Sequence, residues 1–496
     1  MGIRSRISIR GKRSQWAARR RGLPSCAWRA RGHSSAVSGT SSGGQHEKGG
    51  TVNVEALLDG VLGKKVADEL ELVAIRGREE LTRFTDCQIH QNVASVDTTV
   101  HIRAWVDGKA GVVTTNDLTA DGLGRAAQGA AQIARAQTRP AGYAPPDPRP
   151  VEEVGAWDEA TWEASPAERA ALVARAVKGA AELGFNASGS LSTGGAEIWV
   201  RTTRGVDARH RTSAVRFVTV ILGKSGGSGY AEFSGPRLSE FRPEEAAARA
   251  LAKAKLSEVR KALEPGEYTV VLEEPAVATL LGMLSLMGFS ARALLEKRSF
   301  LDGKFGEKLV SDLVTVYDDG LHPKTMVMPF DFEGMPKERV YFFRAGVAEG
   351  VVHDTRTAAL LNAHSTGHAL PPPAAGWSPM PTHVVMEPGA AADEELVSGV
   401  PRGLLVTRFH YARTVDPMRG VMTMMTRDGT FLIEEGRVKG AVEDMRITES
   451  GLRALSLIEA VGREQRLITH GEGFGAYLVP KVRIAKFAFT GRTERM

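Results

Sequence analysis

Two histidines, His364 and His368, have a spacing that could support metal chemistry in this 496-residue chain. On a helix, imidazoles at i and i+4 can reach one metal ion. Gly367 weakens a helix, however, and the prolines at 371–373 end one almost at once. No glutamate lies between the two histidines to act as a base. We expect no metal here, and keep His364 and His368 only as the candidate ligands of a site of an unrecognised kind.

Adjacent carboxylates at Asp318 and Asp319 are a second place where chemistry is conceivable. Paired carboxylates can act as general acid and base, or can bind a cation. They are followed by Gly320, and an Asp-Gly step favours a turn. We interpret this pair as the turn that ends a strand.

The elements around that turn form an ordered series along residues 267–320. A strand is predicted at Glu267–Leu272, where β-branched and aromatic residues follow a Pro-Gly turn. Pro275 suits the first turn of a helix, and Ala276–Met287 is apolar nearly all round. A helix of that composition is buried on most sides. A glycine-rich loop and a second strand at Leu313–Tyr317 are predicted to follow.

This series resembles the TldD/PmbA family, whose active members are zinc metallopeptidases. Further stretches carry the resemblance: Gln88-Ile89-His90-Gln91-Asn92, the long segment that begins GLLVTRFHYARTVDPMRG at Gly403, and the closing VPKVRIAKFAFTG. The likeness runs from about Glu55 to the C-terminus, and the stretches occur in the family's order. It implies a peptidase-related fold and function.

The resemblance also implies where the metal site would be. Active members carry His-Glu-x-x-x-His on the matching helix, directly after a Leu-Leu-like pair. After Leu280-Leu281, this chain has Gly282, Met283 and Met287 at those three positions. Glycine has no ligating side chain, a thioether is a poor zinc ligand, and Met283 cannot take a proton from bound water.

A second departure from the family concerns cysteine. Active members use a cysteine near the C-terminus as a third ligand, and the two cysteines here are Cys26 and Cys87. The chain therefore resembles the TldE (PmbA)-type branch that lacks the zinc motif. We expect no catalytic residue and no cofactor in this chain, with zinc held by a TldD-type partner.

Charge is distributed unevenly along the sequence. Residues 1–50 contain 11 of the 64 Lys/Arg and one of the 58 Asp/Glu, so the rest carries 53 basic and 57 acidic residues. A slightly acidic body gives no electrostatic reason to bind nucleic acid. No apolar run reaches the length needed to span a bilayer. Two cysteines allow no disulfide framework, which favours a reducing cytoplasm.

The basic segment at residues 1–51 is predicted to be disordered, because it is rich in Arg, Ser and Gly and has no periodicity. Three interpretations are open: an organellar transit peptide, an arm that binds nucleic acid, or an over-extended gene start that is not translated. We favour the last, because no strong amphipathic pattern supports targeting.

The remainder predicts an α+β fold in two parts, an N-terminal helix-and-sheet domain over residues 52–263 and a strand-rich C-terminal domain over residues 264–496. Helices are predicted at Ala120–Ala136, after the capping box Ser165-Pro166-Ala167-Glu168, and at Pro243–Leu263. Early strands are predicted at Leu70–Arg76, Glu80–Phe84, Val93–Trp105 and Lys109–Thr115.

The predicted function is that of a non-catalytic subunit in a cytoplasmic, two-component metallopeptidase that degrades or processes unfolded peptides. Its partners would be a TldD-type catalytic subunit and the peptide substrate, with neither a membrane nor nucleic acid involved. Two alternatives remain: a free-standing metallohydrolase using His364 and His368, and a regulatory binding protein whose local support is the basic segment.

Overall fold

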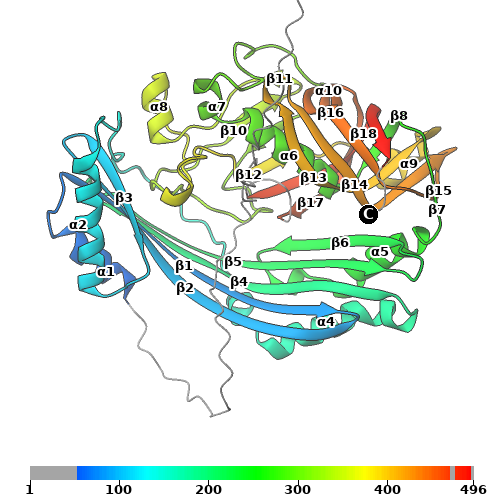
Figure 1. The fold of residues 1–496 in the computed structure, drawn as a ribbon, viewed down its shortest axis with the longest axis horizontal. Helices are drawn as coiled ribbons and strands as arrows, with labels where there is room; N and C mark the ends of the chain where they lie inside the picture. The colour runs from blue at the N-terminus through cyan, green and yellow to red at the C-terminus, as the bar shows by residue number, and fades with distance from the viewer. Residues whose placement is uncertain (1–52, 470–474, 493–496) are drawn as a thin grey trace, which may run out of the picture. The chain divides into compact units, whose positions relative to one another are not determined.

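A computed structural model describes residues 53–469 and 475–492, and the strands in these ranges form two sheets (Figure 1). The α+β class predicted from the sequence is confirmed: helices pack on both sheets, and strands dominate the C-terminal half. The basic segment at residues 1–51 lies outside the described residues.

The first sheet has six antiparallel strands in the order β3-β2-β1-β4-β5-β6. They are β1 (Glu69–Thr85), β2 (Gln88–Val106), β3 (Lys109–Thr115), β4 (Asn186–Thr202), β5 (Asp207–Leu222) and β6 (Ser228–Gly235). The stretches predicted as separate strands at Leu70–Arg76 and Glu80–Phe84 are both part of β1. Gly77 does not interrupt that strand, because it pairs with Asp97 on one side and Ala196 on the other.

Helices cover the first sheet: α1 (Val54–Leu62), α2 (Ala120–Ala136), α3 (Glu159–Trp162), α4 (Pro166–Glu182) and α5 (Pro243–Leu256). The predicted capping box opens α4: the Ser165 backbone N–H donates to Glu168 Oε2 over 2.7 Å, and the Glu168 N–H donates to Ser165 Oγ over 3.2 Å. The small residues of α2 allow it to lie directly on β3, where a Cβ at Gly111 would be 2.2 Å from the Ala130 carbonyl oxygen.

Helix α5 ends at Leu256, earlier than the predicted Leu263, because the chain then joins the second sheet. Strand β7 (Arg260–Lys261) pairs in parallel with β15, so residues predicted to continue the helix form a sheet edge instead.

The second sheet has the order β11-β10-β9-β12-β18-β8-β13-β14-β15-β7, with β16 paired to β14 and β18, and β17 paired to β18. Its strands after β7 are β8 (Gly266–Leu272), β9 (Val316–Asp318), β10 (Val340–Arg344), β11 (Val347–Ala348), β12 (His383–Met386), β13 (Arg402–Asp416), β14 (Val421–Glu434), β15 (Arg437–Val442), β16 (Met445–Ser450), β17 (Ile458–Ile468) and β18 (Ala476–Arg492). β8 pairs in parallel with β13 and antiparallel with β18, which places the predicted strand 267–272 at the centre of the sheet.

The helices of this half are α6 (Glu274–Gly288), α7 (Ala291–Leu295), α8 (Thr355–Leu361), α9 (Asp393–Ser398) and α10 (Gly451–Ser456). Short 3₁₀ turns occur at Leu238–Glu240, Pro372–Ala374 and Pro417–Arg419. Successive residues of β8 and β13 point to opposite faces of the sheet and belong to two apolar layers. Leu272 and Leu404 pack in the core around α6, whereas Val271 and Leu405 pack towards α9.

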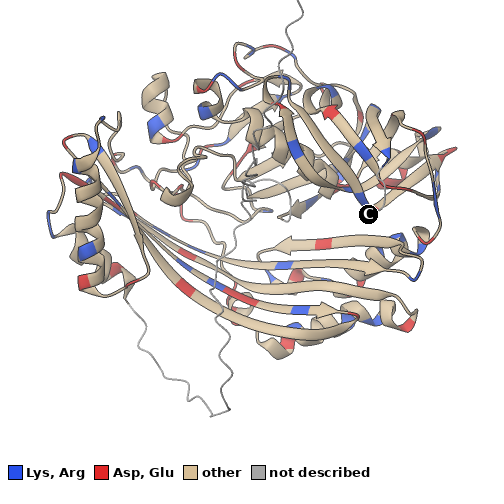
Figure 2. Ribbon diagram, viewed as in Figure 1, with Lys and Arg blue, Asp and Glu red and all other residues tan. Residues whose placement is uncertain are grey.

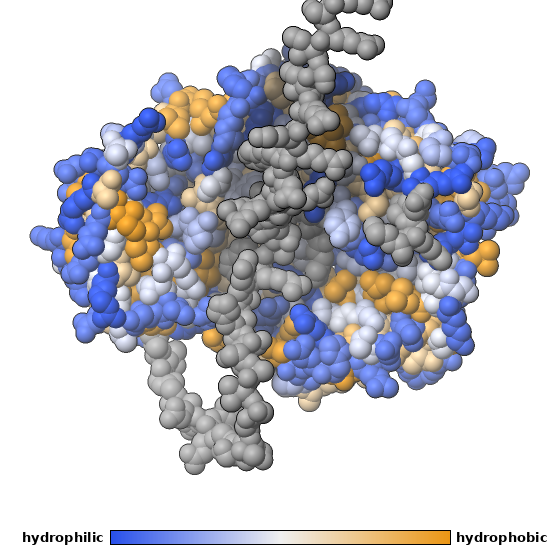
Figure 3. Space-filling model, viewed as in Figure 1, coloured by the Kyte–Doolittle hydropathy of each residue, from blue (hydrophilic) through white to orange (hydrophobic). Residues whose placement is uncertain are grey.

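In the part of the chain that the structure describes, Lys/Arg and Asp/Glu are interspersed over the elements of both sheets (Figure 2). The face shown in Figure 3 is mainly hydrophilic, with apolar residues in separate small groups. None of the helices within the described ranges is long and apolar enough to cross a membrane.

Candidate functional site

Helix α6 stands where the family resemblance places the metal helix. Pro275 occupies its first turn, and the helix runs two residues further at its N-terminal end and one further at its C-terminal end than the predicted Ala276–Met287. Nearly every residue of it is buried, against β13, β17 and β18. Its two hydroxyl groups bond back into the helix: Thr279 Oγ1 to the Pro275 carbonyl and Ser285 Oγ to that of Leu281, each over 2.9 Å.

The three motif positions on α6 lie in an apolar environment. Gly282 is buried, and the side chains of Met283 and Met287 belong to the core that also contains Phe289 and Phe300. In the described ranges, no three His, Cys, Asp or Glu side chains come close enough together to hold a metal ion. A zinc ion would need imidazole, thiolate or carboxylate ligands. The residues present on α6 therefore do not fit the zinc that the family resemblance implies.

The polar groups of this helix gather at its N-terminal end. Glu273 forms an ion pair with Lys253 of α5, and Glu274 forms one with Arg466 of β17, with Arg466 Nε 3.0 Å from Glu274 Oε1. Burial raises the pKa of Glu274. Burial would do the same to Glu273, but the charge of Lys253 and its hydrogen bond outweigh burial and lower the pKa of Glu273. These contacts join α6 to both halves of the chain.

The two candidate histidines are held by different partners. The segment that carries them is not helical, in agreement with the effect expected of Gly367 and the prolines. His364 is exposed, and its Nε2 lies 2.9 Å from Glu338 Oε2. His368 is buried, with Nε2 2.9 Å from Asp318 Oδ1 and Nδ1 2.9 Å from Thr366 Oγ1. Since both ring nitrogens of His368 already have partners, this arrangement does not present the pair to one ion.

Asp318 is the centre of a buried polar cluster, which we call the Asp318 cluster: Asp318, Lys337, His368, Thr382 and His383. The backbone N–H groups of Thr382 and His383 each donate to Asp318 Oδ2 over 2.7 Å, while His368 approaches Oδ1. Lys337 Nζ lies 3.9 Å from Oδ1 and donates to Thr382 Oγ1 over 3.0 Å. Asp318 is the last residue of β9. Its hydrogen bonds connect that strand to His383 of β12 and to Thr382, which precedes β12.

Protonation in the Asp318 cluster follows from these contacts. Burial alone would raise the pKa of Asp318, but Lys337 and the histidine contacts overcome it and hold that pKa below its usual range. Burial lowers the pKa of His383 to about 4 and also lowers that of His368. Both histidines are thus neutral at pH 7. Burial also lowers the pKa of Lys337, and the charge of Asp318 opposes that effect. The neighbouring Asp319 binds Arg339 and the Leu321 N–H, so the Asp-Asp-Gly segment has the structural role predicted for it.

A second buried cluster connects the first sheet to the segment before β10. We call it the Arg103 cluster: Glu71 of β1, Arg103 of β2, and Glu333. Arg103 Nη1 lies 3.4 Å from an oxygen of each glutamate. Neither oxygen of Glu71 accepts a hydrogen bond. Burial raises the pKa of Glu71 to about 7, and also raises that of Glu333.

Sequence reasoning had no signal for the Arg103 cluster or for Lys337 and His383. Arg103 and Glu333 are 230 residues apart. A sequence shows only that each is polar, and polar residues are usually exposed.

Comparison with known proteins places this geometry in a family. Three models of that family match in order: PmbA/TldA metallopeptidase domain 1 over residues 70–134, its central domain over residues 159–258, and its C-terminal domain over residues 265–491. The chain belongs to the PmbA/TldD metallopeptidase family, which confirms the resemblance seen in the sequence.

Two curated relatives share shorter segments. The chain is 27% identical to the metalloprotease TldD homolog of Haemophilus influenzae over 175 residues, which are 35% of this chain and 36% of that protein. It is 27% identical to a metalloprotease of Methanothermobacter thermautotrophicus over 192 residues, 38% of this chain and 41% of that protein. The chain therefore matches well under half the length of either relative.

Solved structures share the fold over most of the chain. TldE from Thermococcus kodakarensis superimposes with a TM-score of 0.81 at 23% identity, covering 88% of this chain and all (100%) of that one. A putative modulator of a DNA gyrase from Thermotoga maritima gives 0.76 at 21% identity, covering 88% and 100%. At these identities the likeness concerns the fold.

Proposed function

We propose that this chain is the non-catalytic, TldE/PmbA-like subunit of a two-component metallopeptidase. A TldD-type partner would hold the zinc and carry out cleavage, and the substrates would be unfolded or extended peptides in the cytoplasm. The observation that carries the proposal is α6, which occupies the place of the family's metal helix but has Gly282, Met283 and Met287 at the motif positions. A helix with these residues can support a fold but cannot activate water.

The role left to such a chain is structural support of the complex. Glu273 and Glu274 connect the N-terminal end of α6 to α5 and β17, and α6 fills the core of the second sheet. The helix thus holds the two halves of this subunit together without contributing a ligand.

A reconstitution assay tests the proposal. An unfolded peptide is incubated with this chain alone, with a TldD-type relative that retains His-Glu-x-x-x-His, and with both. We expect cleavage to be strong only in the mixture, and to disappear when the glutamate of the relative's motif is changed to Gln. Chelator-sensitive cleavage by this chain alone would contradict the proposal.

Metal content gives a second test, which also addresses the free-standing hydrolase. Elemental analysis after reconstitution with zinc is expected to find no stoichiometric metal in this chain, and the variant in which His364 and His368 are both Ala should give the same result. One tightly held zinc per chain that is lost in the double variant would support the alternative instead.

A further inference from the structure

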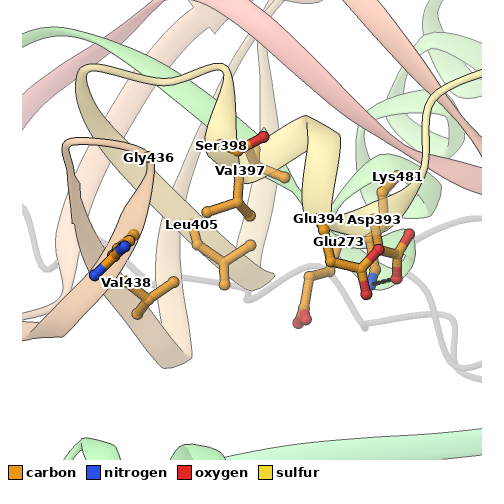
Figure 4. Close-up of a pocket in the computed structure, with 11 residues that line it drawn as sticks. Glu273, Asp393, Glu394, Val397, Ser398, Leu405, Gly436, Val438 and Lys481 are labelled. Atoms are coloured by element: carbon orange, nitrogen blue, oxygen red, sulfur yellow. Dashed lines mark hydrogen bonds and ion pairs between the residues drawn. The ribbon is translucent and has the colours of Figure 1, made fainter.

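A pocket of about 490 Å³ lies on the face of the second sheet opposite α6 (Figure 4). Its floor is apolar, with Val271 of β8, Leu405 of β13, Val397 of α9 and Val438 of β15. The volume lies in the range typical of sites for small ligands.

Both ends of the pocket are held in place by contacts with neighbouring segments of the chain. At one end, the turn between β14 and β15 is fixed to the segment after α9: the Glu435 N–H donates to the Pro401 carbonyl over 2.7 Å, and the Gly436 N–H donates to that of Val400 over 2.9 Å. Gly436 has φ +69°, and a Cβ there would be 2.6 Å from the Ser398 carbonyl oxygen. This close approach leaves little freedom for the turn.

At the other end, α9 is fixed to β17 and β18. The Ala391 N–H donates to the Val461 carbonyl over 3.2 Å, and Lys481 forms an ion pair with Asp393. A pocket with such walls exists before a ligand arrives, which lowers the entropic cost of binding.

Opposite charges stand at the two ends. Figure 4 shows Gly436 and Val438, the neighbours of Arg437, at one end and Glu273, Asp393, Glu394 and Lys481 at the other, with Val397 and Leu405 between them. Glu273, Asp393 and Lys481 are already in ion pairs. Within the described residues, the guanidinium of Arg437 and the carboxylate of Glu394 have no partner. One unpaired cation and one unpaired anion thus face a common apolar floor.

We infer that this pocket binds a short peptide with free termini and an apolar side chain. Its carboxylate would pair with Arg437, its ammonium with Glu394, and its side chain would cover Val397 and Leu405. Guanidinium–carboxylate pairs favour two parallel hydrogen bonds, which suits Arg437 to a terminal carboxylate. Because Val397 and Leu405 lie between the two charges, a ligand whose ammonium and carboxylate are on separate residues suits the pocket better than a single amino acid.

The inference goes beyond the proposed function, because the site belongs to this chain and needs no partner subunit. It can therefore be tested on the full chain by itself, and its failure would leave the reconstitution assay unaffected.

The test is calorimetric titration of the full chain with Leu-Leu, N-acetyl-Leu-Leu and Leu-Leu amide. We expect saturable binding of Leu-Leu, and a loss of about tenfold or more when either terminus is blocked, since blocking removes one of the two charge-assisted contacts. Arg437→Gln should weaken the binding of Leu-Leu by a similar factor. This variant should bind Leu-Leu and Leu-Leu amide with equal affinity. Glu394→Gln should also weaken the binding of Leu-Leu, and this variant should bind Leu-Leu and N-acetyl-Leu-Leu with equal affinity.

The controls keep the result interpretable. Both substitutions are at exposed positions, so the fold should not change, and Arg446→Gln, an exposed arginine on β16, should bind Leu-Leu as the unchanged chain does. Val438→Trp, which fills the floor, should abolish binding. No saturable binding of Leu-Leu, or equal affinity for the free and the blocked peptides, would overturn the inference.

Discussion

Asp318 of the Asp318 cluster and Glu71 of the Arg103 cluster are both buried, but their carboxylates have opposite surroundings. Asp318 accepts hydrogen bonds from two backbone N–H groups and lies beside His368 and Lys337, and its pKa is lowered. Glu71 has Arg103 at 3.4 Å and no hydrogen bond to either oxygen, and its pKa is raised to about 7. Burial raises the pKa of both carboxyls, but Lys337 and the contact with His368 outweigh it at Asp318. At Glu71 the charge of Arg103 does not outweigh burial, and the nearby Glu333 raises the pKa further.

The two clusters also connect different parts of the fold. The Asp318 cluster joins elements within the second sheet, β9 and β12, where both oxygens of the carboxylate have hydrogen-bond partners. The Arg103 cluster joins β1 and β2 to a segment far along the chain. There two glutamates share one arginine, and protonation of Glu71 relieves the excess of negative charge.

The largest effect is expected from Asp318→Ala. The change removes the acceptor of two backbone N–H groups and leaves Lys337 in the interior without its nearest counter-charge. Breaking a buried pair in this way costs about 3–5 kcal/mol, and we expect the upper end of that range. Urea unfolding at pH 7 measures it, with Asp312→Ala as the control, since Asp312 forms an exposed ion pair with Lys308 whose contribution is below about 1 kcal/mol. Equal losses in the two variants would contradict the role given to Asp318.

Arg103→Met should cost about 3 kcal/mol at pH 8, because Glu71 and Glu333 would both lose their cation. The cost should be smaller at pH 5, where protonated glutamates need no counter-charge. Unfolding free energies at the two pH values test this expectation. A loss independent of pH would show that Arg103 acts through packing alone.

Glu71→Gln isolates the pH dependence of that cluster. The pKa of Glu71 is about 7 in the folded chain and about 4.5 in the unfolded chain. Between these two pH values the folded chain binds a proton at Glu71 and the unfolded chain does not. Its stabilising contribution is thus present below pH 4.5 and is lost as the pH rises through 7. We expect Glu71→Gln to become more stable relative to the unchanged chain by between about 1 and 3 kcal/mol from pH 5 to pH 8. A constant difference over that range would show that the pKa of Glu71 is not raised.

The smallest effect is expected from His364→Ala. His364 is exposed and contacts Glu338 only at the surface, so its removal should change the unfolding free energy by less than about 1 kcal/mol. Thermal unfolding of this variant beside His368→Ala measures the contrast, since His368 donates to Asp318 in the interior. Similar losses for the two histidines would mean that burial does not separate their roles.

The parts of the fold set by neighbouring residues could be predicted from the sequence. The capping box at Ser165 and Glu168 depends on contacts within a few residues, which their spacing reveals. The burial of α6 is indicated by its composition, which is apolar nearly all round. The α+β class follows from the same patterns.

The lengths of strands and the polar clusters could not be predicted in that way. β1 runs through Gly77 because strands on both sides complete its hydrogen bonds, and α5 stops early because Arg260 pairs with Ala441 of β15. Asp318 could be read as part of a turn, yet its partners Lys337 and His383 come from elsewhere in the chain. Tertiary pairing decides such features, and one sequence does not display it.

The segment that connects the two halves of the chain contains the short strand β7, and β7 is an edge strand of the second sheet. Arg260 and Lys261 pair with Ala441 and Val442, and the Glu443 N–H donates to the Lys261 carbonyl over 3.0 Å. A fragment that began at residue 264 would lack this strand and would leave the backbone of β15 open to pairing with other molecules. Separate expression of the C-terminal half should therefore give self-association, which retaining residues 258–263 should reduce.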